Sequence, residues 1–561
     1  MDKTTVFMIG NTYMSAAREV GPNMRDYKKE YEEFTLSVPE KFSFPLDVFD
    51  RWGERTALFW TDGLRQERYS FNALRDLSSK GAGALRKMGV GRGDKVLVML
   101  PHVPKWWEVM LALMRVGAVP IPATTLLTAK DIGYRLSATD IKAVITDGED
   151  AWKVEDALNA SLYSGAGRVP SLLIVSERQG WRNYTREREE ATPFEGERVP
   201  SNEPGLIYFT SGTTGPPKIV LHTQASYPLA HLLTGRFWLD LRPGDVHWNL
   251  SDTGWAKAAW SSLFGPWHMG ATIFSFYKEG KFDPSLTIET MEKYAVTTFC
   301  GPPTAYRMMV KEMPESGPAL RTPRHFVAAG EPLNREIIET WRNRTGMYVY
   351  DGYGQTETVN VLGNFRCLPV KPGSMGMPVP GYVVGVVDEN GRPVATEVEG
   401  DIAISVSPER PVGLFREYLG NPEATERTMR GGWYITGDRA YRDKEGYFWF
   451  VGRNDDIILT SGYRIGPFEV ESVLIEHPAV RESAVVASPD EIRGEVVKAF
   501  IVLTKGHEPS AALVAELQQY VKERTAPYKY PRKIEFVKEL PKTISGKIKR
   551  KELKMREFGK I

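Results

Sequence analysis

The segment that decides the fold is Thr210-Ser211-Gly212-Thr213-Thr214-Gly215-Pro216-Pro217-Lys218. Apolar residues flank it on both sides, Leu206 to Phe209 before it and Ile219 to Leu221 after it, so the pattern predicts a strand, a loop and a second strand. Glycines let backbone N–H groups approach phosphate oxygens, while the hydroxyls and Lys218 add further donors and charge. The alternative is a flexible surface loop, but the density of such residues between two buried-looking strands favours phosphate binding.

This glycine-rich loop is not a Walker motif, because no Gly-Lys-Ser/Thr sequence opens a helix after it. Neither a helix dipole nor the mechanism of ordinary NTPases is therefore assumed. A second glycine-rich segment, Gly89-Val90-Gly91-Arg92-Gly93, precedes its strand at Lys95–Leu100 instead of linking a strand to a helix. We interpret it as a plain turn.

Strands and helices alternate over the first two-thirds of the chain. A strand over Phe326–Ala329 ends at Gly330-Glu331-Pro332, a helix with one apolar face follows, and a strand over Met347–Tyr350 leads into Asp351-Gly352-Tyr353-Gly354-Gln355-Thr356-Glu357. Ligands commonly bind at the carboxyl ends of strands in α/β sheets. Both polar motifs are therefore candidates for a binding site.

The pattern becomes β-rich after about residue 365, where a strand over Val383–Val387 and one at Val394 are joined by the hairpin-like turn Asp388-Glu389-Asn390-Gly391. From about Asn454 we expect a compact tail that begins with a helix. The predicted fold class is α/β: a large N-terminal domain (1–453) with several subdomains, including α/β sheets and a small β-rich one, and a small, mobile α+β C-terminal domain (454–561).

The composition is that of an ordinary globular protein. The 561 residues include 72 Lys+Arg and 71 Asp+Glu, a formal charge of +1, so nothing indicates a nucleic acid or a membrane as a stable partner. Cys300 and Cys367 are too few for a disulfide framework. No segment approaches the ~18 apolar residues of a membrane span, and no apolar signal peptide opens the sequence. These features predict a cytoplasmic protein.

Three further segments follow in order, and with the glycine-rich loop and Tyr353–Glu357 they carry a resemblance. They are Trp433-Tyr434-Ile435-Thr436-Gly437-Asp438, Gly452-Arg453-Asn454-Asp455-Asp456 with Ser461-Gly462-Tyr463-Arg464, and Pro541-Lys542-Thr543-Ile544-Ser545-Gly546-Lys547. The chain resembles the adenylate-forming superfamily of acyl-CoA synthetases, luciferases and nonribosomal adenylation domains, over roughly residues 45 to 555. The resemblance implies that ATP and a carboxylic acid form an acyl-adenylate, which then reacts with coenzyme A.

The resemblance also implies roles at the ATP site. Gly330, Glu331, Pro332, Asp351 and Tyr353 resemble an adenine pocket, with Gly352, Gly354, Gln355 and Thr356 in the same motif. Asp438 would accept hydrogen bonds from the ribose hydroxyls, with Arg453 beside it. Glu357 is the implied ligand of the Mg²⁺ that accompanies ATP.

The implied second step uses the small domain. Lys547 would bridge the substrate carboxylate and the α-phosphate during adenylation, with Glu357 and Arg464 as further catalytic residues. Rotation about the hinge Asp455 would then withdraw Lys547. The same rotation would bring up a loop for coenzyme A made of Ser461, Gly462, Tyr463 and Arg464, with Arg493 and Arg524 as further phosphate ligands. For Arg493 and Arg524, simple surface solvation remains an equal alternative.

The acyl pocket is the least defined part of the implied site. The acetate-specific branch of the superfamily has Trp where this chain has Gly354, so the resemblance is closest to medium-chain acyl-CoA synthetases, and Trp238, Trp260 and Cys300 are candidate lining residues. Medium-chain, short branched and aryl acids all remain open. Lys257 could contact coenzyme A or the acyl carboxylate, although a surface lysine is the simpler interpretation.

Three other functions share parts of this pattern. A nonribosomal adenylation domain would pass the acyl group to a carrier protein, a luciferase-like enzyme would oxidise the adenylate, and a regulator would bind nucleotide without catalysis. Lys547, Glu357 and Asp438 argue against the regulator. The oligomeric state is open, with a homodimer among the alternatives.

Overall fold

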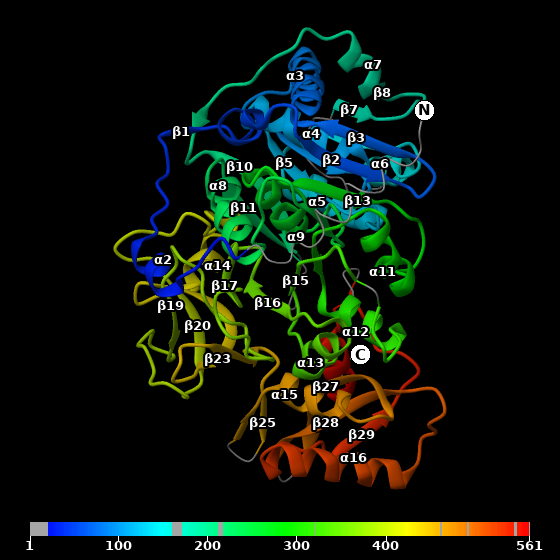
Figure 1. The fold of residues 1–561 in the computed structure, drawn as a ribbon, viewed down its shortest axis with the longest axis vertical. Helices are drawn as coiled ribbons and strands as arrows, with labels where there is room; N and C mark the ends of the chain where they lie inside the picture. The colour runs from blue at the N-terminus through cyan, green and yellow to red at the C-terminus, as the bar shows by residue number, and fades with distance from the viewer. Residues whose placement is uncertain are drawn as a thin grey trace.

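The computed structural model describes residues 21–159, 171–210, 217–318, 320–460, 463–490, 493–543 and 547–559. Figure 1 shows a large N-terminal part above and a small C-terminal part, orange to red, below. Strands and helices alternate through most of the large part, which confirms the predicted α/β class. No described helix has both the length and the apolar character that crossing a membrane requires.

The largest sheet has nine strands in the order β18-β17-β16-β15-β14-β12-β13-β2-β3. The six strands from β16 to β2 are parallel, and the outer strands are antiparallel. Their bounds are β18 Met377–Pro378, β17 Asn360–Gly363, β16 Val349–Gly354, β15 His325–Ala329, β14 Thr298–Gly301, β12 Val246–Asn249, β13 Thr272–Phe276, β2 Thr56–Thr61 and β3 Gln66–Ser70. The central strands are almost continuously apolar because helices α11 (Pro284–Lys293), α12 (Pro303–Glu312) and α13 (Arg335–Thr345) connect them and help to bury them.

A second parallel sheet lies in the first part of the chain, in the order β5-β4-β6-β7-β8. Its strands are β5 Val119–Pro122, β4 Lys95–Met99, β6 Ile141–Thr146, β7 Ser171–Ile174 and β8 Arg182–Asn183, and helices α3 (Phe71–Lys87), α4 (Pro104–Arg115), α5 (Ala129–Ala138), α6 (Ala151–Asn159) and α7 (Tyr184–Glu189) accompany them. The turn expected before β4 is present, and Gly89 and Gly93 adopt positive φ values there, which glycine tolerates without strain.

The glycine-rich loop joins two antiparallel strands, β10 (Pro204–Thr210) and β11 (Lys218–Thr223), and β21 (Glu417–Tyr418) pairs with β11. Both predicted strands are thus confirmed, and Thr210 lies opposite Lys218 in their ladder. Ser211, Gly212, Thr213, Thr214, Gly215 and Pro216 lie outside the described residues. After β11 come α8 (Ser226–Leu233), η3 (Thr234–Trp238), and later α9 (Ala256–Ala259), η4 (Trp260–Phe264) and α10 (Gly265–His268).

The β-rich subdomain, yellow in Figure 1, has the order β19-β20-β23-β22, with β24 paired to β23. Its strands are β19 Val384–Val387, β20 Gly400–Ser405, β23 Trp433–Arg442, β22 Met429–Arg430 and β24 Phe448–Arg453. The predicted turn closes through Gly391 N–H donating to the Asp388 carbonyl, but the arm at Val394 forms no strand. Pro393 has no N–H for a ladder, and β19 pairs with β20 instead.

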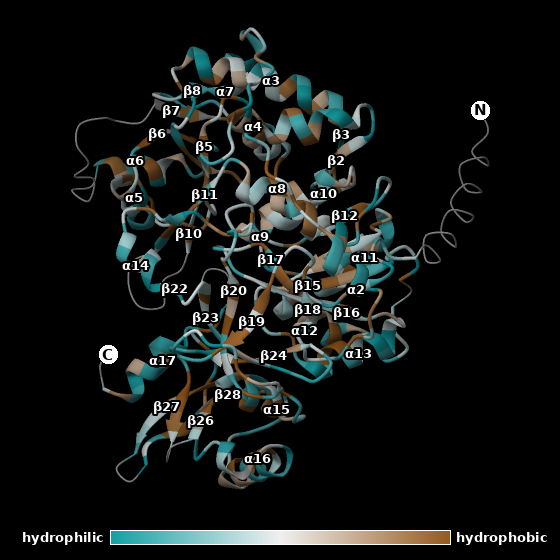
Figure 2. Cartoon of the chain, turned by 90° about the vertical axis from the view of Figure 1, so that its left-hand side faces the viewer, coloured by the Kyte–Doolittle hydropathy of each residue, from teal (hydrophilic) through white to brown (hydrophobic). Residues whose placement is uncertain are grey.

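The small C-terminal part is built on the sheet β26-β25-β28-β27, with β29 beside β28. Its elements are β25 Ile458–Thr460, β26 Tyr463–Ile465, α15 Pro467–Ile475, β27 Val480–Asp490, β28 Gly494–Leu503, α16 Ala511–Arg524, η5 Pro527–Lys529, β29 Lys533–Phe536 and α17 Arg550–Glu557. The expectation of an initial helix was wrong, because the β25–β26 hairpin precedes α15. Figure 2 shows apolar β27 and β28 beside the hydrophilic α17.

Candidate active site

The two polar motifs predicted at strand ends lie on neighbouring strands. Ala329 of β15 pairs with Gly352 of β16, so Gly330-Glu331-Pro332 leaves the sheet beside Asp351–Gly354. The Glu331 carboxylate accepts hydrogen bonds from Thr304 (2.8 Å) and Arg307 (2.9 Å), which fixes the loop by its side chain. The backbone of the Gly330–Pro332 loop is therefore the part that would face an adenine base.

Strand β16 continues further than the sequence predicted, through Tyr353 and Gly354, because it pairs with β17. Asp351 on this strand is buried and accepts a hydrogen bond from the Gly352 N–H at 3.0 Å. Burial raises the pKa of Asp351 well above its ordinary value. This carboxyl group therefore faces the interior of the protein, unlike a solvated surface aspartate.

Asp438 lies at the centre of a hydrogen-bonded group drawn from three motifs. Its Oδ2 accepts from Tyr353 Oη at 2.6 Å and from Gln355 Nε2 at 2.7 Å. Arg453, opposite Asp438 in the β23–β24 ladder, places Nε 3.5 Å from Oδ1. The structure thus brings together four residues that the resemblance assigned to the nucleotide, although up to 100 positions separate them along the chain.

Glu357 lies next to the end of the glycine-rich loop. Its Oε1 accepts a hydrogen bond from Tyr418 Oη at 2.7 Å, and Lys218 Nζ lies 4.7 Å from the centroid of the Tyr418 ring. Tyr418, which the sequence interpretation missed, therefore connects the predicted metal ligand to the predicted phosphate lysine. Within the described ranges, no three His, Cys, Asp or Glu side chains form a group that could hold a metal ion.

His222 is a second residue that the sequence interpretation missed. It lies on β11, four residues beyond Lys218, and its Nε2 is 2.8 Å from the Thr356 carbonyl oxygen. Burial lowers the pKa of His222 to about 3, so the ring is neutral and donates to that carbonyl through Nε2–H. The position of His222, four residues after Lys218, was the one signal for it in the sequence, because its partner Thr356 lies 134 positions away.

Lys257 is buried and lies at the same strand edge, contrary to the simpler interpretation as a surface lysine. Its Nζ donates to the Ala329 carbonyl at 2.8 Å. Burial lowers the pKa of Lys257, and the positive charge of Lys547 lowers it further. Lys547, from the small C-terminal part, is therefore close to the large part's strand edge.

The candidate acyl-pocket residues are all buried around β16 and β14. Trp238 packs against Gly352, while the Trp260 ring lies beside Gly354 and donates from Nε1 to Tyr227 Oη. A Cβ at position 354 would overlap the Val359 carbonyl oxygen and lie 2.6 Å from Cη2 of Trp260. The space expected to be open beside Gly354 is thus bordered by another tryptophan. Burial raises the pKa of Cys300, which lies near Lys257.

The predicted coenzyme A residues lie along one edge of the small sheet. Thr460 of β25 pairs with Gly494, next to Arg493, and Tyr463 stacks on Tyr528 with ring centroids 4.1 Å apart. Arg524 ends α16, over the ring of Tyr520, and Arg464 lies in β26. Ser461 and Gly462 lie outside the described residues.

The predicted hinge residue Asp455 lies between β24 and β25. The Asp456 N–H donates to the Arg453 carbonyl at 3.0 Å, closing a turn across Asn454 and Asp455. The boundary at 453/454 and the hinge itself stay predictions.

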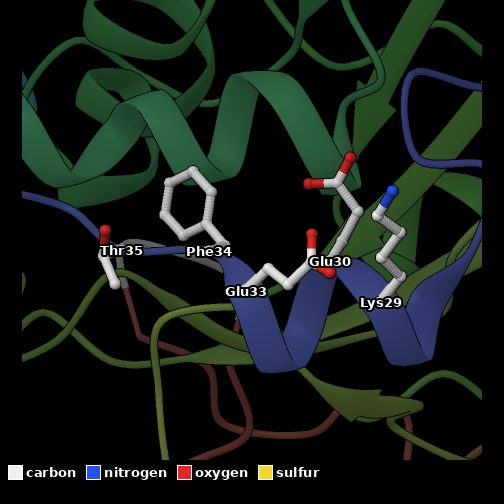
Figure 3. A pocket seen from close by; sticks show the side chains of 5 residues that line it. All are labelled: Lys29, Glu30, Glu33, Phe34 and Thr35. Atoms are coloured by element: carbon white, nitrogen blue, oxygen red, sulfur yellow. The ribbon is translucent and has the colours of Figure 1, made fainter.

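One surface hollow lies apart from these motifs. It is formed on α2 (Tyr27–Glu33) and the residues after it, and Figure 3 shows its lining: Lys29, Glu30, Glu33, Phe34 and Thr35. None of these residues belongs to the predicted site.

Comparison with known proteins gives a consistent result. The family described as AMP-binding enzyme matches residues 47–419, and the AMP-binding enzyme C-terminal domain matches residues 469–547. Acyl-coenzyme A synthetase ACSM3, mitochondrial, of Mus musculus is 50% identical over 553 residues, covering 96% of this chain and 94% of the relative; the Homo sapiens protein of that name is 48% identical, with 96% and 94% covered.

Solved structures agree with these relatives. A crystal structure of the anthranilate CoA ligase AuaEII in complex with anthranoyl-AMP has a TM-score of 0.84 at 29% identity, covering 93% of this chain and 98% of that one. A Brucella canis acyl-CoA synthetase has a TM-score of 0.73 at 32% identity, covering 96% of this chain and 100% of that one.

The comparisons correct one expectation. The prediction of a cytoplasmic location is wrong, since the similar acyl-coenzyme A synthetases of mouse, rat and human are named mitochondrial. The sequence argument looked for an apolar signal peptide, whereas mitochondrial transit peptides are amphipathic and rich in arginine and serine.

Proposed function

The chain belongs to the family of AMP-binding enzymes and is an acyl-CoA synthetase that uses ATP and coenzyme A, and from this premise we propose which residues act in each of its two reaction steps. In the first step an acid oxygen attacks the α-phosphorus of ATP, forming acyl-AMP and releasing pyrophosphate. In the second, the thiol of coenzyme A attacks the acyl carbon and AMP leaves. The single observation that carries the proposal is the group of Tyr353, Gln355 and Arg453 gathered around the Asp438 carboxylate.

We assign the ribose of ATP to Asp438. Tyr353 and Gln355 both donate to Oδ2, which fixes the carboxylate plane, while Oδ1 faces Arg453. An ionised carboxylate accepts several hydrogen bonds, so it can bind two neighbouring hydroxyls without losing these partners. The adenine would lie against Tyr353 and the Gly330–Pro332 backbone.

Glu357 is the proposed ligand for Mg²⁺. The described hydrogen bond from Tyr418 reaches only Oε1, which leaves Oε2 for a cation, and Lys218 lies on the other side of Tyr418. One carboxylate suits a Mg²⁺ that keeps its waters and phosphate oxygens as its other ligands. The ion would neutralise charge on the phosphates, while Glu357 would fix its position relative to the glycine-rich loop.

Lys547 is the proposed stabiliser of charge in the first step. A lysine supplied by a separate domain can enter and leave, so the site can be used first for adenylation and then for the thiol. Rotation about Asp455 would withdraw Lys547 and bring the edge that holds Tyr463, Arg464, Arg493 and Arg524 to the adenylate. Guanidinium groups suit the phosphates of coenzyme A.

The acid is a medium-chain, short branched or aryl acid in our proposal. The apolar, aromatic surroundings of Trp260 and Gly354 support an uncharged acyl group. Lys257, at the Ala329 carbonyl, supports attachment of the carboxylate or of coenzyme A near the same strand edge.

The test is release of AMP by the purified enzyme over a panel of acids from acetate to benzoate, with and without coenzyme A. We expect coenzyme A-dependent AMP release with several mid-sized acids. Turnover without coenzyme A would favour another acceptor, and light or aldehyde formation would favour a luciferase-like reaction. Absence of AMP with every acid would favour a regulator and overturn the proposal.

A variant separates the steps. We expect Lys547→Ala to lose acid-dependent exchange between pyrophosphate and ATP, while it retains thioester formation from supplied acyl-AMP. Equal loss of both half-reactions would contradict the role of Lys547.

A further inference from the structure

Arg550 forms the most buried ion pair in the neighbourhood of Lys547. It is the first residue of α17, three positions after Lys547. Its Nε and one terminal nitrogen donate to the two carboxylate oxygens of Glu471 on α15, at 2.9 and 2.6 Å. Glu471 is only 4% exposed and also accepts the Val485 N–H at 2.7 Å. The guanidinium is therefore held in a fork by a carboxylate that is itself fixed.

The same guanidinium reaches two other motifs. Its remaining terminal nitrogen lies 3.9 Å from Oδ2 of Asp456, the residue after the predicted hinge. Burial lowers the pKa of Arg550, but Glu471, Asp456 and Glu331 together raise it above its ordinary value. Glu331 belongs to the large part, in the predicted adenine motif. Arg550 thus connects the lysine loop with α15 and with the hinge segment.

The loop that carries Lys547 has weaker attachments elsewhere. It closes on itself, since Thr543 N–H donates to the Lys547 carbonyl (2.7 Å) and Lys549 N–H to the Pro541 carbonyl (2.9 Å). Lys542 pairs with Glu482 at 2.7 Å, but both side chains are about one-third exposed, and such pairs contribute little. In the described part of this segment, Leu540 and Ile548 pack on the apolar cluster of β27 and β28, and Arg550 with Glu471 adds a polar fork to this attachment.

We propose that Arg550 is a positioning residue for adenylation: its pairing with Glu471 and Asp456 fixes the lysine loop in the position from which Lys547 acts at the ATP site. This inference rests on the proposed function of Lys547. It does not require Arg550 to touch ATP or the acid.

The geometry predicts an effect on one half-reaction. The contacts with Glu471 and Asp456 lie within the small part, so they fix the position of Lys547 whenever that part faces the ATP site. A displacement of about 1 Å in a charge-stabilising group can lower a rate by about a hundredfold. Loss of Arg550 should therefore impair adenylation more than the thiol step, which does not use Lys547.

The experiment compares Arg550→Met with Arg556→Met. Arg556 lies on the same helix and pairs with Glu535, but its side chain is 58% exposed, so it is the matched control. A second variant, Arg550→Met with Glu471→Gln, keeps an acceptor for Val485 N–H and leaves no unpaired buried charge, should the single variant fail to fold. Arg550→Lys keeps the charge without the fork.

Each variant is assayed by pyrophosphate–ATP exchange and by thioester formation from supplied acyl-AMP, with butyrate or hexanoate, whichever the wild-type enzyme turns over faster. For both Arg550→Met forms we expect about a 10- to 100-fold fall in the kcat of exchange, little change in KM for ATP, and thioester formation within about threefold of wild type. Arg550→Lys should be intermediate.

Two results would overturn the inference. If Arg550→Met lowers both half-reactions equally, or no more than Arg556→Met does, Arg550 is merely structural. If Lys547→Ala retains exchange in the same assay, the proposed role of Lys547 fails and this inference fails with it. Loss of exchange in Lys547→Ala together with normal exchange in both Arg550→Met forms would reject only the role of Arg550.

Discussion

At the scale of single residues, Trp260 and Gly354 are the proposed limit on how far an acyl chain can extend. The Trp260 ring occupies the space beside Gly354, and a side chain at 354 would overlap the Val359 backbone. We therefore expect Trp260→Ala to raise kcat/KM for longer or bulkier acids relative to butyrate by about tenfold, because each methylene accommodated in an apolar pocket contributes ~1–3 kcal/mol. The measurement is the AMP-release panel run on wild type and variant.

The contrasting variant is Gly354→Ala. It adds one methyl group that would overlap the Val359 backbone, so it should lower the melting temperature without widening the range of acids that the enzyme accepts. If Trp260→Ala leaves the order of preferred acids unchanged, Trp260 does not line the acyl pocket.

The candidate residues of the nucleotide site could be named from the sequence, but not their partners. Asp438 and Glu357 stood out because they belong to the ordered motifs that carry the resemblance to the adenylate-forming superfamily. Tyr418, His222 and Arg550 did not, since each acts through a contact with a residue 61 or more positions away. Such contacts depend on how sheets pack, which local periodicity does not encode.

At the scale of elements, apolar runs predicted β4, β10, β11 and β15, because each buries a face that the periodicity reveals. The predicted strand bounds were wrong where pairing with a neighbouring strand determines the length of a strand. Strand β16 extends to Gly354 because β17 lies beside it. The arm at Val394 does bond to β19, through Val394 N–H and the Val386 carbonyl, but it forms only an isolated bridge because Pro393 has no N–H to extend the ladder. Sequence alone does not specify which neighbour a strand will have.

Helix α13 faces the end of α15 across the boundary between the large and small parts. Asn334 Nδ2 donates to Ser472 Oγ at 2.9 Å. Burial and the like charge of Glu476 raise the pKa of Glu336, and burial raises the pKa of Glu476. Glu336→Gln should remove this repulsion and stabilise the described orientation. We expect thioester formation to slow by about two- to fivefold while exchange is unchanged, since such pairs contribute under ~1 kcal/mol.

The control for this effect is Glu315→Gln, which removes an exposed carboxylate of the large part that is not among the charges acting on Glu336 or Glu476. It should change the ratio of the two half-reactions less than Glu336→Gln does. A ratio that is the same in wild type and Glu336→Gln would show that the charges at this boundary do not bias the orientation.

At the scale of the whole molecule, buried neutral histidines should make stability depend on pH. Burial lowers the pKa of His247 to about 3 and that of His268 and His325 to about 4, whereas an unfolded histidine titrates near 6.5. Between pH 6.5 and 4 the unfolded chain binds more protons, so the free energy of unfolding falls as pH falls, by up to about 1.4 kcal/mol per pH unit for each such histidine. Above about pH 6.5 these histidines add no pH dependence.

His247 contacts Thr298 and Ser261 at 2.7 Å, and His247→Gln should lower the free energy of unfolding at pH 8 yet flatten its slope below pH 6.5. Urea unfolding at pH values from 8 to 4 measures this free energy, and His507→Gln, a change at an exposed histidine, is the control. Parallel curves for wild type and His247→Gln would mean that this ring is not buried in its neutral form.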